Sequence, residues 1–437
     1  MGRFAVSVFL LFSFSAISFA EGQKTSITID EGISRVLKDS RLLKIEIAGA
    51  DMSFEDTLLA LSKLLPHISA SINKTYNQYT PEMLTGLSRM PTGEKEPLAY
   101  GIDVYQTLFD FGKSISSYKA STEVLKARKA NIETVKRTVT LDFIFSYFDL
   151  LEAEKMISVA EREIESLTSY LKDMNSLFDE GVIVKNDLLA AKVRLADARQ
   201  KLTVSRSLRE LAAARLNTVL TLPLSGDITA SEVELDIPEL PAMEDAFRSA
   251  QNQRPEISFF EGEIRASIAR ERAYAAGNLP AIFADGGYRY GENRHMAHED
   301  NAYIQLGAKM DLYDGGVTGA LVMKERKDLE RLKEQKVKLV EDIKYEVKSS
   351  ILALNDAREK LDVANEAFAQ SEENVRFYRI KFNNGVATST DVLEAITLET
   401  RAETNYYTAD YELKRSYAKL LYSMGKDMTT IYKKTEK

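Results

Sequence analysis

The chain has 437 residues, 44% of them hydrophobic, and a formal charge of −8 at neutral pH. The absence of cysteine excludes disulfides, thiolate metal sites, cysteine nucleophiles and a lipid anchor on an N-terminal cysteine. An acidic chain without a basic cluster is a poor candidate for nucleic-acid binding, and the sequence contains no Walker loop, nucleophile elbow or metal-ligand cluster. We therefore expect no enzymatic activity, cofactor or metal.

The first predicted element is a secretory signal peptide, residues 1–20. Arg3 precedes an apolar run over residues 4–19, and the small residues Ser18 and Ala20 stand just before a polar residue, Glu21. This run is shorter than a membrane-spanning helix requires, although a retained anchor is an alternative interpretation. No later apolar stretch is long enough for a transmembrane helix.

The rest of the chain is a tandem duplication. Residues 108–112 (LFDFG) match 312–316 (LYDGG), and residues 178–198 match 382–402; 312 − 108 and 382 − 178 both equal 204. We therefore interpret residues 21–230 as a first structural repeat and 231–437 as a second.

Each repeat begins with two helices and a β-hairpin. The hairpins are predicted at about 67–110 and 281–313, because apolar and polar residues alternate there, as in Ile68, Ala70 and Ile72. Each strand has roughly ten residues, the length that a tilted strand needs to cross a bilayer. The first hairpin is longer than the second, and we place the extra residues in an exposed loop around 82–95.

A long helix hairpin follows each β-hairpin, at about 113–220 and 317–424. Apolar residues step by three and four, which predicts coiled-coil packing of helices about 90 Å long. Four glycines are expected to be turn or swivel residues with unusual backbone angles: Gly112, Gly181, Gly316 and Gly385. The seam predicted for the first long helix is Ile157, Ala160, Ile164, Leu167, Leu171, Met174 and Phe178.

Two segments lack such patterns. Residues 223–241 contain prolines and acidic residues and are expected to be irregular, crossing the outside of the helix bundle. Residues 426–437 are predicted to be a short, polar and loosely ordered tail.

The strand count sets the architecture. Each repeat supplies two strands, and four strands cannot span a membrane alone, because every backbone polar group in lipid must be paired. Only closed barrels achieve this with strands, so several chains must contribute. Three chains would give a twelve-stranded barrel; two or four would also close.

Six motifs in matched order resemble the TolC family of bacterial outer-membrane efflux proteins. Leu-Pro pairs at 65–66 and 279–280 precede the first strand of each repeat, LFDFG and LYDGG enter the long helices, and FDEGV and FNNGV form the turns. The segment 254–256 (RPE) is similar to the family's N-P-E helix start. The resemblance covers residues 27–425. It implies an α+β membrane protein, a homotrimer with a twelve-stranded barrel in outer-membrane lipid, continued by a coiled-coil tunnel in the periplasm.

The resemblance also implies partners and a function: a periplasmic adaptor protein, an inner-membrane transporter, and a passive channel that exports small molecules. An exit duct for one-step (type I) protein secretion is an alternative. A periplasmic coiled-coil scaffold or adhesin is an alternative of another class.

Asp391 and Glu394 are the predicted pore constriction. They lie three residues apart at the start of a helix, so they project from one face, and by resemblance they occupy the family's acidic aperture. Rings of carboxylates there would favour cations. The other interpretation, compatible with the first, is helix capping.

Asn186, Asp187 and Phe382 occupy positions where the family links helices at its closed entrance. The family's usual partners are a tyrosine and an arginine, but this chain has Phe382 and Ala387, which cannot make those links. Asn383 or Asn384 could substitute.

Two further groups of residues have structural interpretations that require no specific function. His295 and His298 lie in a polar loop, which we interpret as exposed rather than as a metal site. The strand tyrosines either form a belt at the membrane interface or simply favour strand structure; they are Tyr76, Tyr100, Tyr105, Tyr288, Tyr290, Tyr303 and Tyr313.

Overall fold

The computed structural model describes residues 25–429 and divides the chain into two compact units. Unit 1 contains the described residues up to Gly32 together with Phe145–Glu234 and Glu366–Thr408. Unit 2 contains Ile33–Ile144, Leu235–Asn365 and the described residues from Ala409 onward. Both units draw on both sequence repeats. The predicted signal peptide and the end of the predicted tail, 430–437, lie outside the described residues.

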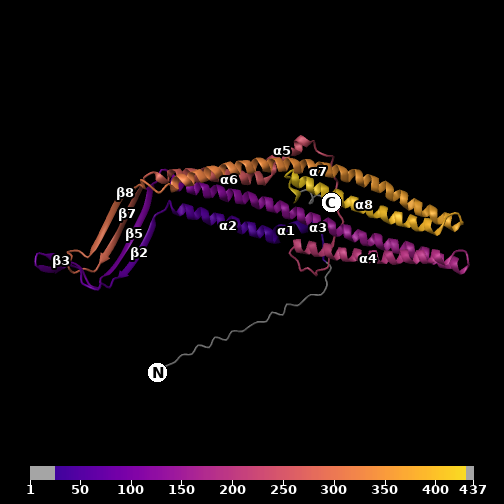
Figure 1. Ribbon diagram of the computed structural model, residues 1–437, viewed down its shortest axis with the longest axis horizontal. Helices are drawn as coiled ribbons and strands as arrows, with labels where there is room; N and C mark the ends of the chain where they lie inside the picture. Colours follow the sequence, from indigo (N-terminus) through magenta and orange to yellow (C-terminus); the bar gives the residue numbers. More distant parts are fainter. Residues whose placement is uncertain (1–24, 430–437) are drawn as a thin grey trace, which may run out of the picture. The chain divides into compact units, whose positions relative to one another are not determined.

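Unit 2 contains a four-stranded antiparallel sheet in the order β2-β5-β7-β8 (Figure 1). The pairing of β5 with β7 joins the two repeats and places both strands inside the sheet. Strands β2 and β8 are its edges. The bounds are β2 (His67–Lys74), β5 (Leu98–Phe109), β7 (Ala281–Gly291) and β8 (Asp300–Lys309).

The register of this sheet separates apolar from polar residues. Ile68 pairs with Val104, and Gly286 with Ile304, so one face is apolar across the sheet. Ile304 is nevertheless 85% exposed in the chain. The opposite face carries a polar network, in which Asp103 accepts hydrogen bonds from Arg289 and Tyr303. A sheet with an uncovered apolar face and a polar face suits the wall of a membrane channel.

The same register corrects the predicted tyrosine belt. Tyr100 and Tyr290 stack on the apolar face, with ring centroids 4.8 Å apart, but Tyr105 and Tyr303 lie on the polar face. These two cannot belong to a lipid-facing belt, because successive strand residues point to opposite faces.

A second correction concerns the extra residues of the first β-hairpin. Residues 82–95 are exposed as expected, but they are not an irregular loop: β3 (Glu82–Thr85) pairs with β4 (Ser88–Pro91). Gly86 has a φ of +66°, which allows the two-residue turn between these strands.

Specific side-chain contacts hold two of the helix starts in unit 2. The side chain of Ser40 caps α2 by accepting a hydrogen bond from the amide of Leu43. Between α5 and α6, Arg254 is 7% exposed and binds Glu256 at 2.9 Å and Glu346 at 2.8 Å. The bounds are α1 (Ile29–Asp39, across the boundary of the two units), α2 (Arg41–Ser62), α5 (Met243–Gln253), α6 (Pro255–Ala275) and the 3-10 turn η1 (Ala276–Asn278).

The duplication is visible in the lengths of the long helices. Helices α3 (Lys113–Asp179) and α7 (Val317–Asn383) have 67 residues each, and α4 (Lys185–Val219) and α8 (Ser389–Ser423) have 35 each. Helices α3, α7 and α8 each contribute one part to unit 1 and another to unit 2. No helix within residues 25–429 combines the length and apolar character that crossing a bilayer requires.

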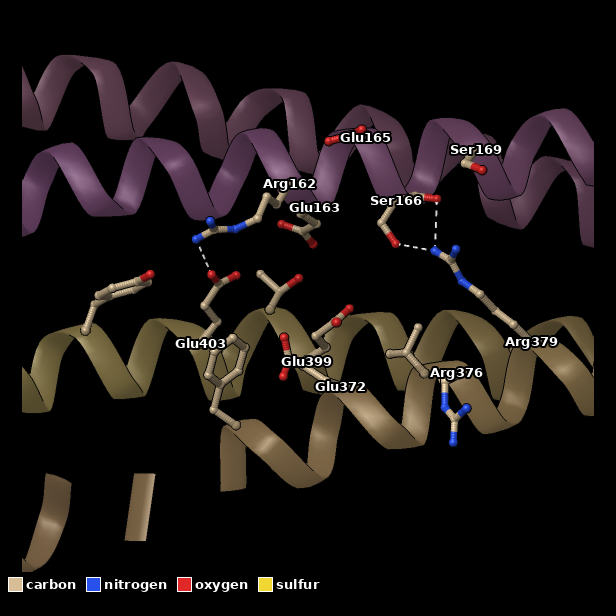
Figure 2. A pocket seen from close by; sticks show the side chains of 14 residues that line it. Arg162, Glu163, Glu165, Ser166, Ser169, Glu372, Arg376, Arg379, Glu399 and Glu403 are labelled. Carbon is tan, nitrogen blue, oxygen red and sulfur yellow. Dashed lines mark hydrogen bonds and ion pairs between the residues drawn. The ribbon is translucent and has the colours of Figure 1, made fainter. Parts of the chain in front are cut away.

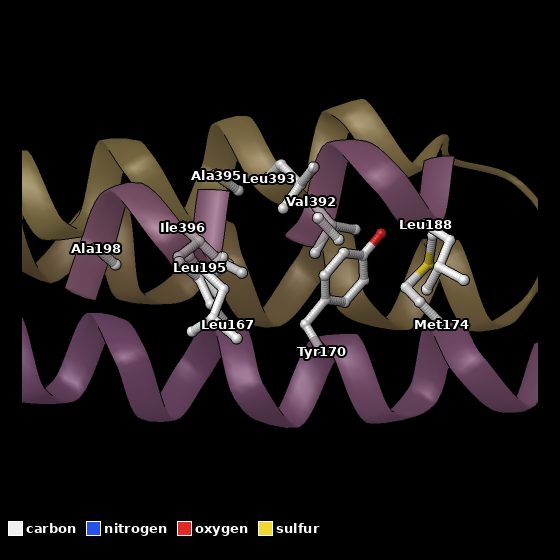
Figure 3. Packing of buried hydrophobic residues seen from close by; sticks show 12 residues of the cluster. Leu167, Tyr170, Met174, Leu188, Leu195, Ala198, Val392, Leu393, Ala395 and Ile396 are labelled. Carbon is white, nitrogen blue, oxygen red and sulfur yellow. The ribbon is translucent and has the colours of Figure 1, made fainter. Parts of the chain in front are cut away.

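Unit 1 is built around the seam between these helices (Figure 3). Leu167 and Met174 of α3 face Leu188 and Leu195 of α4, while α7 contributes Val375. The predicted seam is buried or half-buried except at its end, where Phe178 is 36% exposed. The sequence pattern missed Tyr170, which is only 3% exposed in the same seam.

The segment between the repeats is also more ordered than expected. Within residues 223–241, β6 (Ile228–Ala230) pairs in parallel with β1 (Thr25–Ile27). The buried hydroxyl of Tyr147 donates a hydrogen bond to the carbonyl of Ser231 at 2.6 Å, which holds the segment against α3. A tyrosine inside a long helix thus orders a segment that has little apolar content of its own.

Close helix contact in unit 2 can be tested at Gly262 of α6. A Cβ there would lie 2.9 Å from the Cβ of Ala127 and 3.1 Å from the carbonyl oxygen of Glu123, both in α3. We expect Gly262→Ala to lower the apparent Tm of the purified protein, because overpacking of about 1–3 kcal/mol outweighs the helix-propensity gain of about 1 kcal/mol. The control is Gly319→Ala in α7, where no atom lies within 4 Å; an equal effect of both changes would contradict the prediction.

Candidate functional site

The turns that close the two helix hairpins of unit 1 have the same geometry. The amide of Val182 donates to the carbonyl of Leu177 at 2.8 Å, and the amide of Val386 donates to that of Lys381 at 2.8 Å, again 204 residues apart. Gly181 and Gly385 have φ of +76° and +72°. This is a glycine-terminated helix end, in which the left-handed residue lets the chain reverse.

The entrances to the long helices are also equivalent. Gly112 and Gly316 have φ of +88° and +87°. The aspartate of each motif caps the following helix: Asp110 accepts from the amide of Ser114 at 2.8 Å, and Asp314 from the amide of Thr318 at 2.7 Å. All four predicted turn glycines therefore have left-handed backbones, while their role as hinges stays a prediction.

Asp391 caps the N-terminus of α8. Its carboxylate accepts hydrogen bonds from the backbone amide and the hydroxyl of Thr388, both at 2.7 Å, and its own amide donates back to that hydroxyl. The bonds from Thr388 hold the pKa of Asp391 below its ordinary value. Glu394 is exposed on the same helix turn. The capping interpretation is thus confirmed, and the aperture role stays a prediction.

The predicted entrance residues do not form links within one chain. Asn186 is exposed and Asp187 is half-buried at the start of α4, where Val184 provides no side-chain cap. Phe382 packs edge-on against Tyr170, with ring centroids 5.6 Å apart. Asn383 and Asn384 are exposed. The position of the family's tyrosine is therefore occupied by the apolar Phe382, which packs against a neighbouring helix.

A different tyrosine connects the two hairpins. The hydroxyl of Tyr170 in α3 donates to the hydroxyl of Ser389 at 3.1 Å and to its carbonyl at 3.3 Å. Both residues are at most 5% exposed. Because a buried hydroxyl needs a partner, this contact ties α3 to the first residue of α8.

A cavity of about 730 Å³ lies in unit 1 between α3, α7 and α8 (Figure 2). We call it the charged chamber. Arg162 of α3 pairs with Glu403 of α8, and Arg379 of α7 binds Ser166 of α3. Its remaining charged or titratable lining residues are Glu163, Glu165, Glu372, Arg376, Glu399 and Tyr407.

Burial dominates the electrostatics of the chamber. It raises the pKa of Glu403, which is 6% exposed, despite the opposing effect of Arg162. It also raises the pKa of Glu399, against the opposing charges of Arg379 and Arg162, and the nearby carboxylates of Glu372 and Glu403 add to that rise. Carboxylates in such surroundings hold protons at a higher pH than in water.

Sequence reasoning missed the chamber, although a signal was present. Val392, Ile396, Glu399 and Glu403 step by four, three and four along α8, so two acids occupy seam positions. Acidic residues in an apolar stripe indicate a polar contact between helices. The contact partners, Arg162 and Arg379, come from distant segments and carry no such signal.

The histidine loop offers no metal site. His295 and His298 are exposed, and among residues 25–429 no group of three or more His, Cys, Asp or Glu side chains could hold a metal ion.

Comparison with known proteins identifies the family. The profile described as outer membrane efflux protein matches residues 32–221 and 246–426, one segment in each repeat. The chain belongs to the outer membrane efflux protein family. It is similar to the outer membrane protein TolC of Vibrio cholerae serotype O1, with 25% identity over 440 residues and coverage of 94% of both chains. The resemblance to the TolC family is therefore confirmed.

Solved channel structures show the same fold. The outer-membrane channel OprN aligns with a TM-score of 0.80 at 18% identity, covering 92% of this chain and 90% of that one. The CmeC outer membrane channel of Campylobacter jejuni aligns with a TM-score of 0.81 at 15% identity, covering 97% and 93%.

The fold class is thus that of a trimeric TolC-family channel, with a barrel and a helical tunnel. Four strands from each of three chains make twelve. The protein is an outer-membrane efflux duct whose helical part lies in the periplasm, and channels of this kind act in tripartite efflux systems.

The link between Tyr170 and Ser389 gives a testable prediction. Tyr170→Phe keeps the ring packing but removes the hydroxyl, so we expect a loss of about 1 kcal/mol. Amides at the start of α8 should then exchange with deuterium about fivefold faster. Tyr378→Phe is the control, since the hydroxyl of Tyr378 makes no hydrogen bond within the described part of the chain. An unchanged amide exchange rate at the start of α8 in Tyr170→Phe would show that this hydrogen bond does not stabilise the contact.

Proposed function

We propose that the duct exports small molecules and works passively, with energy supplied by an inner-membrane transporter through a periplasmic adaptor. The observation that carries this proposal is the pair of equivalent helix hairpins, each closed by a glycine turn beside a polar or acidic helix start. Separation of the hairpins would widen the passage at this end, with Gly181 and Gly385 as hinges.

Asp391 and Glu394 are proposed as the selectivity element of the aperture. In a trimer each residue occurs three times, so the two would form adjacent rings of carboxylates that attract cations. Hydrogen bonds from Thr388 support this role for Asp391, because they keep its carboxylate charged at a pH below its ordinary pKa.

A groove on unit 1 is the proposed docking site of the adaptor. A cavity of about 550 Å³ lies between α3, α4 and α8, and Val204 and Leu208 of α4 are 52% and 54% exposed there. Lys201 and Asp197 supply charge beside this apolar patch. Such a groove fits one apolar face of an amphipathic helix.

The aperture proposal predicts a change in ion selectivity. The double variant Asp391→Asn, Glu394→Gln keeps hydrogen-bond acceptors but removes two charges per chain, so cation preference in planar-bilayer reversal potentials should fall. Glu366→Gln, an exposed acid on α7, should leave it unchanged. Selectivity equal to that of the unaltered protein in the double variant would exclude these residues from the aperture.

The groove proposal predicts a loss of export without a loss of the channel. Val204→Glu together with Leu208→Glu places charges at the apolar contact, which should cost about 2 kcal/mol or more, over tenfold in adaptor affinity. Cells with the variant should lose efflux, while the purified trimer still conducts ions. Leu224→Glu, at a 68% exposed site outside the groove, is the control. Full efflux in the double variant would refute this docking site.

A further inference from the structure

The duplicated sequence provides an internal comparison for the charged chamber. Glu399 lies 204 residues after Leu195, and Leu195 is an apolar seam residue with 6% exposure. The equivalent of Glu403 is Arg199, which is exposed. The second hairpin therefore has carboxylates where the first has an apolar seam residue and an exposed arginine. Helix packing alone does not require this difference, because a leucine at the same seam position packs well in the first hairpin.

Figure 2 shows which groups face Glu399 and Glu403 from the neighbouring helices. Helix α3 presents Arg162, and α7 presents Glu372 and Arg379. The other titratable lining residues have partners or are exposed. Glu163 pairs with Lys201 of α4, Arg376 pairs with Glu373, Glu165 is exposed, and Tyr407 of α8 forms a hydrogen bond with Arg162.

These groups leave an unbalanced charge in the chamber. Three carboxylates, those of Glu372, Glu399 and Glu403, line this part of the chamber with two guanidinium groups, an excess of one negative charge. Glu372 is exposed at the side of the chamber, and its charge acts on Glu399 from there. Arg162 is committed to Glu403, and Arg379 to Ser166, where its Nε is buried without a hydrogen-bond partner. Glu399 and Glu372 form no ion pair within the described part of the chain. Bringing the helices together therefore forces like charges into a partly dehydrated space, which costs free energy unless a proton binds.

The sign of the pH effect follows from the packed state. Packing raises the pKa of Glu399, so the packed hairpins bind a proton more tightly than separated ones. The resulting stabilisation is complete below the ordinary glutamate pKa and is lost as pH rises through the raised value. Acid should therefore tighten this seam, and alkali should loosen it.

We propose that the charged chamber is a proton-dependent clasp between the two hairpins, with Glu399 as the group that takes up the proton. The proton cancels the excess charge, so the hairpins pack together. Its loss restores repulsion between Glu399 and Glu372, and the hairpins part. The consequence for transport rests on the proposed function, in which separation of the hairpins widens the duct; the clasp itself does not.

The test measures the separation of the hairpins directly. Because the chain has no cysteine, nitroxide labels can be placed at Thr168→Cys in α3 and Ala369→Cys in α7, both exposed. Diluting labelled chains with unlabelled chains gives trimers with one labelled pair. Pulsed electron paramagnetic resonance then measures the distance between the two nitroxides from about pH 8 to about pH 5. We expect the short-distance population to grow on acidification. The ratio of the two populations should change tenfold for each unit by which the pKa of Glu399 differs between packed and separated hairpins.

Three variants separate the clasp from a general pH effect. Glu399→Gln mimics the protonated acid, and Glu399→Leu restores the residue of the first hairpin; both should show the short distance at every pH. Arg162→Gln increases the charge excess and should favour the long distance. The matched control is Glu366→Gln, which should keep the pH response of the unaltered chain.

Three results would overturn the clasp: a label distance that does not change with pH in the unaltered chain, an unaltered pH response in both Glu399 variants, or a distance that grows in acid. Planar-bilayer conductance of the unaltered protein gives the separate readout for the duct. If the protein conducts ions but the label distance does not change with pH, the clasp is refuted and the duct is not. If the label distance changes with pH but the protein does not conduct, the duct is refuted and the clasp is supported.

Discussion

The open edges of the four-stranded sheet constrain everything else in this protein. β2 and β8 end the sheet, and its register collects most of the apolar residues of the four strands on one uncovered face. An apolar face favours lipid, but lipid forbids unpaired backbone groups at a sheet edge. Both conditions are met when sister chains pair at these edges, which is the trimeric barrel of the family.

Within unit 1, duplication places two equivalent hairpins against one another. The positions at which they differ indicate which residues do more than pack the helices. The turn at Gly181 and the turn at Gly385 share their hydrogen bonds because chain reversal makes the same demand on both. Val184 and Thr388 differ, and only the second forms a capping pair with an aspartate. The capping aspartate Asp391 and the chamber carboxylates Glu372, Glu399 and Glu403 thus belong to the second repeat, whereas Arg162 of the chamber comes from the first.

The links between the hairpins are few and individually weak. Tyr170 with Ser389, Arg162 with Glu403 and Arg379 with Ser166 connect α3 to the second hairpin. A hydrogen bond of this kind contributes about 1 kcal/mol, and a half-exposed ion pair such as that of Arg162 contributes little more. A duct that opens needs two packings of similar free energy, and a seam with polar links can alternate between them.

The sequence alone determined the long helices, the four strands of the large sheet and the repeat, because period-two and period-3.6 patterns and glycine turns are local properties. It did not reveal the short pairs β1–β6 and β3–β4. It also placed Asp391 at a helix cap, and the resemblance carried by its motifs identified the family. Only the tertiary structure decided which side chains meet: that Tyr170 binds Ser389 and packs on Phe382, that Tyr303 lies on the polar face, and that Glu399 shares a chamber with Arg162. Such contacts join residues 200 or more positions apart, and no local pattern encodes their distance or their burial.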